Sequence, residues 1–565
     1  MKNKTLSLNF VLCCLLSLNL FLNSCSEKEQ VKEPESRPNI LMIVLDDAGY
    51  SDLGPFGGEI LTPSIDNLAS EGIVFSQFSV TPNCSSTRAS LLTGMDHHRT
   101  GMGTHGGPTE NQKGKPGYEG ILNDRVITMA EVLQNGGYHT MMAGKWHLGN
   151  KQEHTWPSGR GFDKSFALLN GGASHWDESP LFPGKPSVYV DNGKPLHSFP
   201  NSFYSSDYFT KKIKEYIESN NNEKPFFAFL SFTAPHNPLH APKDLIDKYE
   251  DQYKDGWDAL QTTRLKQLKS SGMIDNDVTP QPRPEWIPAW ESLDEEKKEL
   301  AARDMAVYAA MIDRLDYNIG LLINQLKKMG AYENTMIFVF SDNGPSKTKI
   351  QDYLALAGAD AGFMDNYNNT LDNRGLQNSS VDLGPGWAYG IAAPFRLMKG
   401  YQSQGGVLSP LIVKPPKKWN IQSSHINKPV HVMDIMPTFL EVANISHPIK
   451  EPTDELLEMQ GVSMIPLIKG ENGIDFENRG FGSELFGVRA YRKGEWKILK
   501  LPVPYGSGEW QLYNLKNDPG ENNDLAKNHA EILEELSKLW EDYAKENGVV
   551  EPNKLSLYTL PPGNH

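Results

Sequence analysis

The chain has 565 residues, a formal net charge of −15 and 22% charged residues. This length exceeds what one simple core usually holds, so we expect two or more subdomains. The acidic balance, together with the lack of a basic tract, argues against nonspecific binding to nucleic acid.

Residues 1–24 have the pattern of a lipoprotein signal peptide. A basic start precedes an apolar run from about Leu6 to Leu22, and Leu22-Asn23-Ser24-Cys25 resembles a bacterial lipobox, in which Cys25 is lipidated after cleavage. The alternative is a plain transmembrane anchor. Residues 25–36 are charged and nearly free of apolar side chains, as in a flexible tether. We therefore expect a lipid-anchored protein of the bacterial cell envelope, held at the membrane through Cys25 on the periplasmic side or the outer-membrane surface.

The four cysteines narrow the chemistry of the mature chain. Cys13 and Cys14 are lost with the signal peptide, and acylation uses Cys25. Cys84 is then the single remaining thiol, so we expect no intramolecular disulfide.

Buried strands alternate with helices along residues 37–460. Six-residue apolar runs such as Ile40–Leu45 are typical of strands that are buried on both faces. The alternation predicts an α/β domain with a large, mostly parallel sheet flanked by helices. The predicted elements are strands at Ile40–Leu45, Val74–Phe78, His139–Ala143, Phe226–Phe232 and Met336–Phe340, and helices at Pro63–Glu71, from Cys84, at Val126–Asn135, Phe209–Ser219 and Asp294–Met329.

Residues 461–565 follow a different pattern. Strands at Trp496–Leu499 and Trp510–Leu515 precede an amphipathic helix that contains Leu536 and Trp540. We interpret residues 37–460 as the catalytic domain. Residues 461–565 are predicted to be a smaller C-terminal subdomain of antiparallel sheet plus helix.

Chemically capable residues follow four of the predicted strands. In open α/β sheets, ligands bind just beyond the carboxyl ends of the strands. If the carboxylates converge there, they need a cation, and their oxygen donors with the neighbouring amide favour Ca²⁺ or Mg²⁺ over zinc. An isolated Asp-Asp or Asp-Asn pair is otherwise most often a turn. The residues are Asp46 and Asp47, Lys145 and His147, His236, and Asp342 and Asn343.

Cys84 and Arg88 are separated by about one helical turn, so both side chains can face one point. A thiol at a helix N-terminus beside a guanidinium is typical of anion-binding and nucleophilic sites. The alternative is a buried structural cysteine with a surface arginine. Together with Lys145, His147 and His236, Arg88 would form a positive pocket suited to a tetrahedral oxyanion.

At these residues the chain resembles the type I sulfatases of the alkaline phosphatase superfamily, and among them the bacterial arylsulfatases. The family motif is Cys-x-Pro-x-Arg, then four residues, then Thr-Gly; here Cys84 to Arg88 is followed by Thr93-Gly94, with Ser86 in the proline position. Further matching blocks are Arg37-Pro38-Asn39, Asp46–Tyr50, Gly144–Gly149, Pro235-His236, Gly256-Trp257, Ser341–Gly344, Lys399-Gly400 with Gly405-Gly406, and Glu484–Gly487.

The resemblance implies a sulfate ester hydrolase in which a maturase oxidises Cys84 to formylglycine (3-oxoalanine), whose hydrate is the nucleophile. It further implies one Ca²⁺, with Mg²⁺ second, held by Asp46, Asp47, Asp342, Asn343 and the modified Cys84. Arg88 would hold the hydrate, while Lys145 and Lys399 would neutralise sulfate oxygens. His236, aided by Lys399, would protonate the leaving alcohol, and His147 would remove the remaining hydroxyl proton to release sulfate.

Several points stay open in the sequence. The substrate can be an aryl or a carbohydrate sulfate. Two rival functions are a formylglycine-dependent phosphodiester or phosphonate hydrolase and a catalytically silent glycan-binding lipoprotein. Asp96-His97-His98 is expected to have a loop role rather than to bind metal, and residues 358–380 are either a substrate-facing loop or a solvated one.

Overall fold

The computed structural model describes residues 37–196, 198–221, 223–356, 361–449, 453, 456–471, 473–554 and 556. The predicted signal peptide, Cys25 and the tether lie outside the described residues. From Pro38 onward the described chain forms one compact unit. Among the described residues, no helix combines the length and the apolar character needed to cross a membrane.

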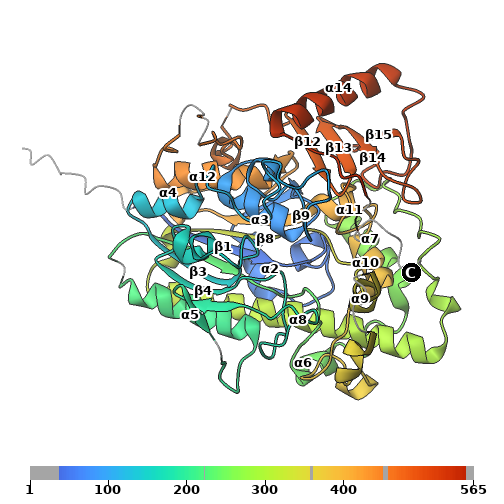
Figure 1. Ribbon diagram of the computed structural model, residues 1–565, viewed down its shortest axis with the longest axis horizontal. Helices are drawn as coiled ribbons and strands as arrows, with labels where there is room; N and C mark the ends of the chain where they lie inside the picture. Colours follow the sequence, from blue (N-terminus) through green and yellow to red (C-terminus); the bar gives the residue numbers. More distant parts are fainter. Residues whose placement is uncertain are drawn as a thin grey trace, which may run out of the picture. The chain divides into compact units, whose positions relative to one another are not determined.

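A large sheet forms the centre of this unit (Figure 1). Its order within the described residues is β10-β2-β9-β8-β1-β7-β3-β4-β5-β6, and β11 pairs with β2. The strands are β1 (Asn39–Leu45), β2 (Ile73–Ser79), β3 (His139–Lys145), β4 (Lys164–Leu168), β5 (Tyr189–Asp191), β6 (Lys194–Leu196), β7 (Phe226–Ser231), β8 (Thr335–Ser341), β9 (Leu408–Lys414), β10 (Ser424–Ile426) and β11 (Val430–His431).

The central strands β8, β1, β7, β3 and β4 all run parallel. Antiparallel pairing is confined to β9, which lies between β8 and β2, and to the β4-β5-β6 edge. The prediction of a large, mostly parallel sheet is therefore confirmed. The strand β9 was not predicted, because Pro410 and its neighbouring serine interrupt the apolar run that would have indicated it.

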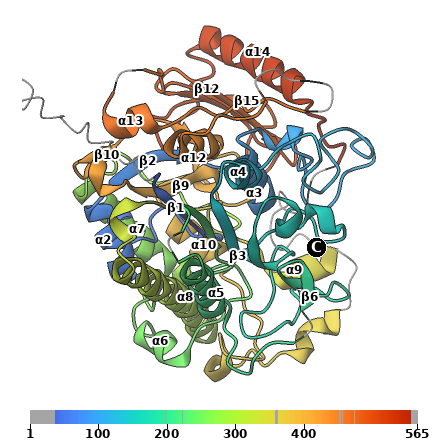
Figure 2. The same ribbon diagram turned by 90° about the vertical axis from the view of Figure 1, so that its left-hand side faces the viewer.

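Both faces of the sheet are buried. Along β1, Leu41 and Ile43 pack into one hydrophobic core, while Met42 and Val44 pack into another, as the two-residue period of a strand requires. Helices α2 (Pro63–Ser70), α5 (Ser205–Ser219), α7 (Gly256–Ser270) and α8 (Glu295–Lys328) contribute to the first core. Helices α3 (Cys84–Thr93), α4 (Met129–Asn135), α12 (Ile435–Ala443) and α13 (Ile465–Lys469) contribute to the second, on the opposite face (Figure 2).

Capping residues set where two of the predicted helices begin. The helix predicted from Val126 begins at Met129, because Thr128 forms a capping box with Glu131. Helix α8 begins after Asp294, whose side chain accepts a hydrogen bond from the Lys297 amide. The other α-helices that the described residues form before the C-terminal sheet are α6 (Lys243–Lys248), α9 (Ile350–Leu356), α10 (Gly384–Ala392) and α11 (Gln404–Val407).

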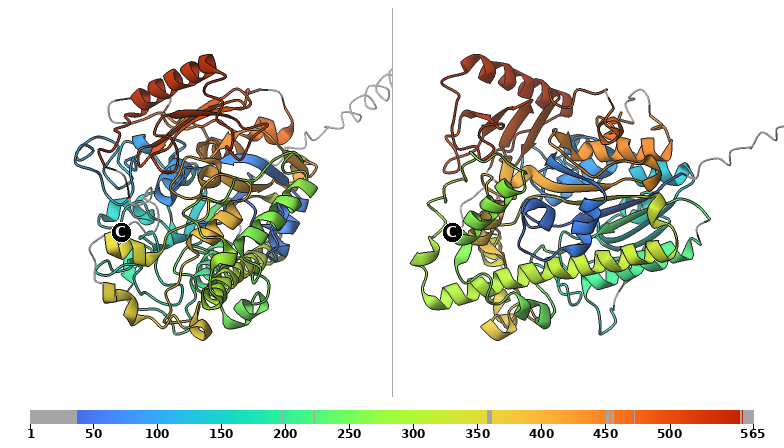
Figure 3. Two further views of the ribbon diagram at one scale, coloured as in Figure 1. Left: turned by 90° about the vertical axis from the view of Figure 1, so that its right-hand side faces the viewer. Right: turned by 180° about the vertical axis from the view of Figure 1, so that it is seen from behind.

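The C-terminal part forms a second, antiparallel sheet with the order β12-β13-β14-β15. Its strands are β12 (Gly480–Leu485), β13 (Val488–Lys493), β14 (Trp496–Lys500) and β15 (Trp510–Asn514), and helix α14 (Ala530–Asn547) covers it (Figure 3). Leu536 and Trp540 of α14 pack against Ile498 and Leu512. The predicted antiparallel sheet with one covering helix is confirmed, and the proposed boundary between residues 460 and 461 stays a prediction.

Candidate functional site

Four adjacent strands bring the predicted site residues to one edge of the large sheet. The order β8-β1-β7-β3 places the ends of these strands side by side. Asp342 follows β8, Asp46 follows β1, and Lys145 is the last residue of β3. His236 lies five residues beyond the end of β7. The convergence expected from the strand ends is therefore what the topology produces.

Cys84 is the first residue of α3 and is almost fully buried. The side chain of Asn83 caps the helix by accepting a hydrogen bond from the Ser85 amide at 3.4 Å. The thiol Sγ lies 3.5 Å from Asp46 Oδ1 and 3.1 Å from Lys399 Nζ. Burial raises the pKa of the Cys84 thiol to about 12, although the nearby lysines oppose the change, so the unmodified thiol stays protonated at neutral pH.

Arg88 points into the site and not to the surface, because only 1% of its side chain is exposed. Its Nε donates to Asp342 Oδ2 at 2.9 Å, and its Nη2 lies 2.7 Å from the same oxygen in an ion pair. Its Nη1 donates to the Lys145 carbonyl at 2.9 Å and to Ser231 Oγ at 2.5 Å. The alternative of a surface arginine is wrong, and Arg88 connects the second turn of α3 to the ends of three strands.

Two lysines complete the charge balance of the cluster. Lys145 Nζ lies 2.6 Å from Asp46 Oδ2, and Lys399 Nζ lies 2.6 Å from Asp47 Oδ1. Burial disfavours the Asp47 carboxylate, but Lys399, His236 and Lys145 together hold its pKa well below the usual range. With Arg88, three cationic side chains thus accompany three buried carboxylates. An additional anion, such as a sulfate group, would bring excess negative charge to this place unless a further cation accompanied it.

The donor set fits a hard divalent cation. Asp47 Oδ2 and Asn343 Oδ1 are buried and have no hydrogen-bond donor among the described residues. Asp46, Asp47, Cys84 and His236 offer ligand atoms within 4.8 Å of one another. The Asn343 Nδ2 group donates to Asp47 Oδ1 at 2.6 Å, which leaves its carbonyl oxygen available for another partner. Carboxylate and amide oxygens are the ligands that Ca²⁺ and Mg²⁺ prefer.

Both predicted histidines lie in the site and favour the neutral form. His236 Nε2 is 3.7 Å from Asp47 Oδ2, and the other ring nitrogen is 2.6 Å from the Asn237 carbonyl. Burial, with Lys399 and Lys145, lowers the pKa of His236 to about 3 despite Asp47. Burial and Lys145 likewise lower the pKa of His147. The backbone of His147 is left-handed, with φ of 62°, a conformation that costs energy in a residue with a Cβ atom and occurs often at functional sites.

Three contacts to the site were not foreseen from the sequence. His105 is 3.1 Å from Ser85 Oγ, and its ring meets the His147 ring edge-on at 4.9 Å between centroids. Ser231 Oγ donates to the Lys145 carbonyl at 2.7 Å and thus supports Arg88. A Cβ atom at Gly171 would lie 2.6 Å from the His147 ring. No residue pattern indicates these roles, because each depends on segments that meet only in space.

The Asp96-His97-His98 motif makes structural contacts. His98 Nδ1 lies 2.8 Å from Asp96 Oδ1, and its Nε2 lies 3.0 Å from Glu484 Oε2 on β12. The three residues are close enough together to hold a metal ion, but both ring nitrogens of His98 already have carboxylate partners. This geometry agrees with the expected loop role. It also connects the segment after α3 to strand β12 of the C-terminal sheet.

Residues 361–380 contain two short 3₁₀ helices, Ala361–Asn366 and Leu371–Asn373. Arg374, in the same segment, pairs with Asp304 of α8 at 2.7 Å. The substrate-facing role of this segment stays a prediction.

Two solved structures match the fold of this protein over most of its chain. The crystal structure of i-CgsB in complex with a neocarrahexaose matches with a TM-score of 0.64 and 24% identity, over 92% of this chain and 95% of that one. A phosphonate monoester hydrolase of Agrobacterium radiobacter matches with a TM-score of 0.53 and 16% identity, over 90% and 96%. These likenesses show the fold, a large and mostly parallel α/β sheet followed by a smaller antiparallel sheet.

Residues 38–445 match the Sulfatase family model, and residues 398–546 match the model of the N-sulphoglucosamine sulphohydrolase C-terminal region. The chain belongs to the sulfatase family and is a sulfuric ester hydrolase. It is 41% identical to an uncharacterized sulfatase of Schizosaccharomyces pombe, over 92% of this chain and 96% of the relative. It is 37% identical to an arylsulfatase of Klebsiella aerogenes, over 76% and 92%.

Proposed function

We propose that this sulfatase hydrolyses aryl or carbohydrate sulfate esters with a formylglycine hydrate formed from Cys84 and with one bound divalent cation, Ca²⁺ in preference to Mg²⁺. The observation that carries the proposal is the position of Cys84. Cys84 is the first residue of α3, and its Sγ atom lies 3.5 Å from Asp46 Oδ1 and 3.1 Å from Lys399 Nζ. A nucleophile generated there would stand among the carboxylates, the lysines and Arg88.

The cation would be held by Asp46, Asp47, Asp342, Asn343 and the modified side chain at position 84. This assignment is supported by the buried oxygens Asp47 Oδ2 and Asn343 Oδ1, which accept no hydrogen bond from a described residue. When bound, a divalent cation supplies positive charge that lowers the pKa of a neighbouring hydroxyl and offsets the charge of a sulfate oxygen.

The side chains of the site account for both halves of the reaction. In the first half, one hydrate hydroxyl at position 84 loses its proton to solvent and its oxygen attacks the sulfur atom, and the bond between sulfur and the ester oxygen breaks. His236 delivers the proton that the departing alcohol needs, while Lys145 and Lys399 balance the sulfate charge. A sulfate monoester beside His236 adds negative charge, which raises the proton affinity of the ring.

In the second half, His147 accepts the proton of the remaining hydroxyl. The bond between carbon and the sulfated oxygen then breaks, inorganic sulfate leaves, and the aldehyde is restored. Addition of one water molecule to the aldehyde regenerates the hydrate. Because burial and nearby cations keep His147 neutral, its ring can accept this proton. Dividing one difficult displacement into two steps is the general advantage of a covalent nucleophile.

The names of the relatives favour sulfate esters over phosphate or phosphonate esters. They include an arylsulfatase and an N-acetylglucosamine-6-O-sulfatase of Bacteroides thetaiotaomicron. A solved structure with the same fold holds D-glucosamine-2-N,6-O-disulfate. The likeness to the phosphonate hydrolase concerns the fold alone, and the complete set of site residues speaks against a silent binding protein.

We further propose that two modifications during biogenesis prepare the enzyme. A formylglycine-generating maturase would act on the segment around Cys84, and lipidation of Cys25 would hold the enzyme at the cell envelope. A Cys25→Ser protein should leave the membrane fraction and retain its turnover.

Mass spectrometry of the peptide that contains Cys84, from protein made in its native host, tests the chemistry. We expect a mass that corresponds to the aldehyde or its hydrate, and loss of 4-nitrophenyl sulfate turnover in a Cys84→Ala protein. A chelator should abolish turnover, and added Ca²⁺ should restore it. A fully active protein with an unmodified thiol would refute the mechanism, whereas faster hydrolysis of an aryl phosphodiester than of the sulfate would favour the rival function.

A further inference from the structure

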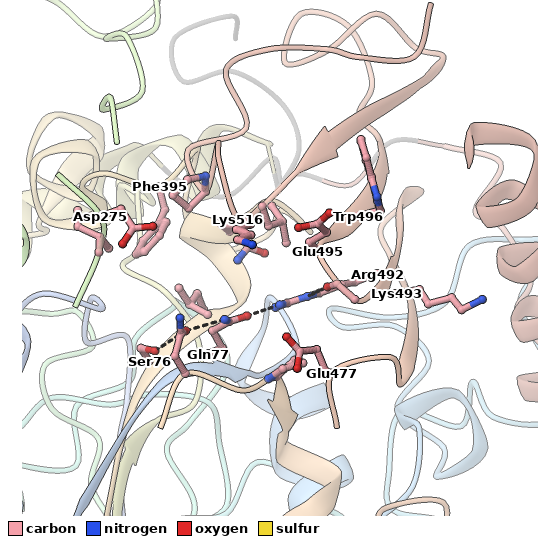
Figure 4. A pocket seen from close by; sticks show the side chains of 18 of the residues that line it. Ser76, Gln77, Asp275, Phe395, Glu477, Arg492, Lys493, Glu495, Trp496 and Lys516 are labelled. Atoms are coloured by element: carbon pink, nitrogen blue, oxygen red, sulfur yellow. Dashed lines mark hydrogen bonds between the residues drawn. The ribbon is translucent and has the colours of Figure 1, made fainter. Parts of the chain in front are cut away.

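A groove with a volume of about 770 Å³ lies between the large sheet and the C-terminal sheet. Ser76 and Gln77 of β2 line one side, and Arg492 and Trp496 of the C-terminal sheet line the other (Figure 4). None of the proposed catalytic residues lines it. Its volume falls within the range of about 300–1,000 Å³ that is usual for ligand-binding pockets.

Arg492 is the unusual residue of this groove. Only 8% of the residue is exposed, yet its polar contacts are with neutral oxygens, the side-chain carbonyl of Gln77 and the main-chain carbonyl of Gly494. It makes no ion pair with a carboxylate of the described residues. Burial alone lowers the pKa of this guanidinium, to about 10. A buried cation without a counter-ion is costly, so the site favours a ligand that brings an anionic group.

The other charges of the groove limit how much negative charge a ligand can carry. Two of its acidic side chains are already neutralised, since Glu477 pairs with Lys428 and Glu535 pairs with Lys493 at 2.7 Å. Lys516 adds an exposed ammonium group that makes no ion pair with a described residue.

The remaining acids, Asp275 and Glu495, are exposed on the rim and also make no ion pair with a described residue. They would repel a densely charged polyanion and accept hydrogen bonds from hydroxyl groups. The mixture of positive and negative side chains in the groove therefore favours a ligand with few anionic groups and many hydroxyl groups.

The neutral residues that line the groove also favour a ligand rich in hydroxyl groups. The Gln77 amide is held by Asn427 and Arg492. The Nδ2 group of Asn427 and the Oδ1 atom of Asn478 make no hydrogen bond to a described residue, so they can donate to and accept from sugar hydroxyls. The half-buried indole of Trp496 lies at the edge of the groove, and its contact with the His529 ring, at 5.1 Å between centroids, holds it there (Figure 4). An aromatic face beside convergent polar groups suits the apolar face and hydroxyl edge of a sugar ring.

We propose that this groove is an accessory binding site for a sparsely sulfated saccharide, in which Arg492 receives a sulfate ester and the surrounding amides and carboxylates receive hydroxyl groups. The site holds a glycan at a place separate from the hydrolytic cluster, so its occupancy does not require that any ester be cleaved there. Binding in this groove therefore does not depend on the formylglycine chemistry.

The test measures binding without turnover. A Cys84→Ala protein is titrated calorimetrically with a sulfated neocarrahexaose and with its desulfated counterpart. We expect Arg492→Gln, added to Cys84→Ala, to weaken binding of the sulfated oligosaccharide about tenfold or more, since a charged hydrogen bond is lost. Arg489→Gln is the matched control, because this arginine of the same strand pairs with Glu551 and does not line the groove.

Further measurements separate the groove from the hydrolytic site. Arg492→Gln in the otherwise unchanged enzyme should turn over 4-nitrophenyl sulfate at the original rate. Should this variant fail to fold, Trp496→Ala and Lys516→Ala, at less buried positions, are expected to weaken oligosaccharide binding in its place. The proposal is overturned if the sulfated oligosaccharide does not bind, if the desulfated one binds equally well, or if folded variants of the groove bind it as tightly as the Cys84→Ala protein.

Discussion

Replacing His98 tests quantitatively how the C-terminal sheet is attached to the part of the chain that contains the large sheet. The ring lies between Asp96 and Glu484, at 2.8 and 3.0 Å, with no exposed side-chain surface. Burial disfavours the charged ring, but these two carboxylates outweigh it and raise the pKa of His98 from 6.5 to about 9. At 1.36 kcal/mol for each pKa unit, the charged ring contributes about 3 kcal/mol to folding.

The sign of the pH dependence follows from this direction. Because the folded pKa lies above the unfolded one, the stabilisation is complete below pH 6.5 and is lost as the pH rises through about 9. The difference in free energy of unfolding between the original protein and His98→Gln should therefore shrink across this window. Urea denaturation at several pH values from 6 to 10 measures it.

The control for this experiment is His425→Gln, at an exposed position of β10. It should reproduce the pH dependence of the unsubstituted protein. If the His98→Gln protein and the unsubstituted protein show parallel stability curves between pH 6.5 and 9, the ring is not held as a cation between the two carboxylates.

Two further predictions concern the site itself. Gly171→Ala places a Cβ atom 2.6 Å from the His147 ring, so we expect kcat for 4-nitrophenyl sulfate to fall roughly tenfold or more. The control is Gly473→Ala, whose Cβ would meet its nearest neighbour at 3.6 Å and should leave kcat unchanged. An unaltered kcat in Gly171→Ala would contradict the assigned role of His147. Ser86→Pro should fold, since the third residue of a helix needs no amide donor. It should lose about 1 kcal/mol with the 2.5 Å contact to Thr81 Oγ1. Mass spectrometry should show more complete conversion of Cys84 than in the unsubstituted protein, and conversion that is already complete without the change would show that Ser86 is no obstacle.

The sequence carried most of the information on the chemical groups of the site. Asp46, Lys145 and Asp342 were identifiable because a polar residue directly after a long apolar run marks the carboxyl end of a buried strand. Cys84 and Arg88 were identifiable because one helical turn separates them. Lys399 was assigned by family resemblance alone, since it follows neither a predicted strand nor a predicted helix.

Features that depend on contacts between distant segments could not be predicted from local sequence patterns. The strand β9 enters the sheet antiparallel between β2 and β8, although its sequence contains Pro410. The groove around Arg492 joins β2 to β13, more than 400 residues later in the chain, and no local pattern connects them. The supporting roles of His105 and Ser231 depend on similar contacts between distant segments.

The sequence by itself determined the alternation of strands and helices, the residues at the strand ends and the helical spacing of Cys84 and Arg88, because these depend on local periodicity. Only the tertiary structure decided which strands are neighbours, and therefore which charges meet. The pairing of Lys399 with Asp47 joins residues that are 352 positions apart, and the contact between Arg492 and Gln77 joins residues that are 415 apart. Such contacts arise from the order of the strands and the packing of the two sheets, which local sequence patterns do not encode.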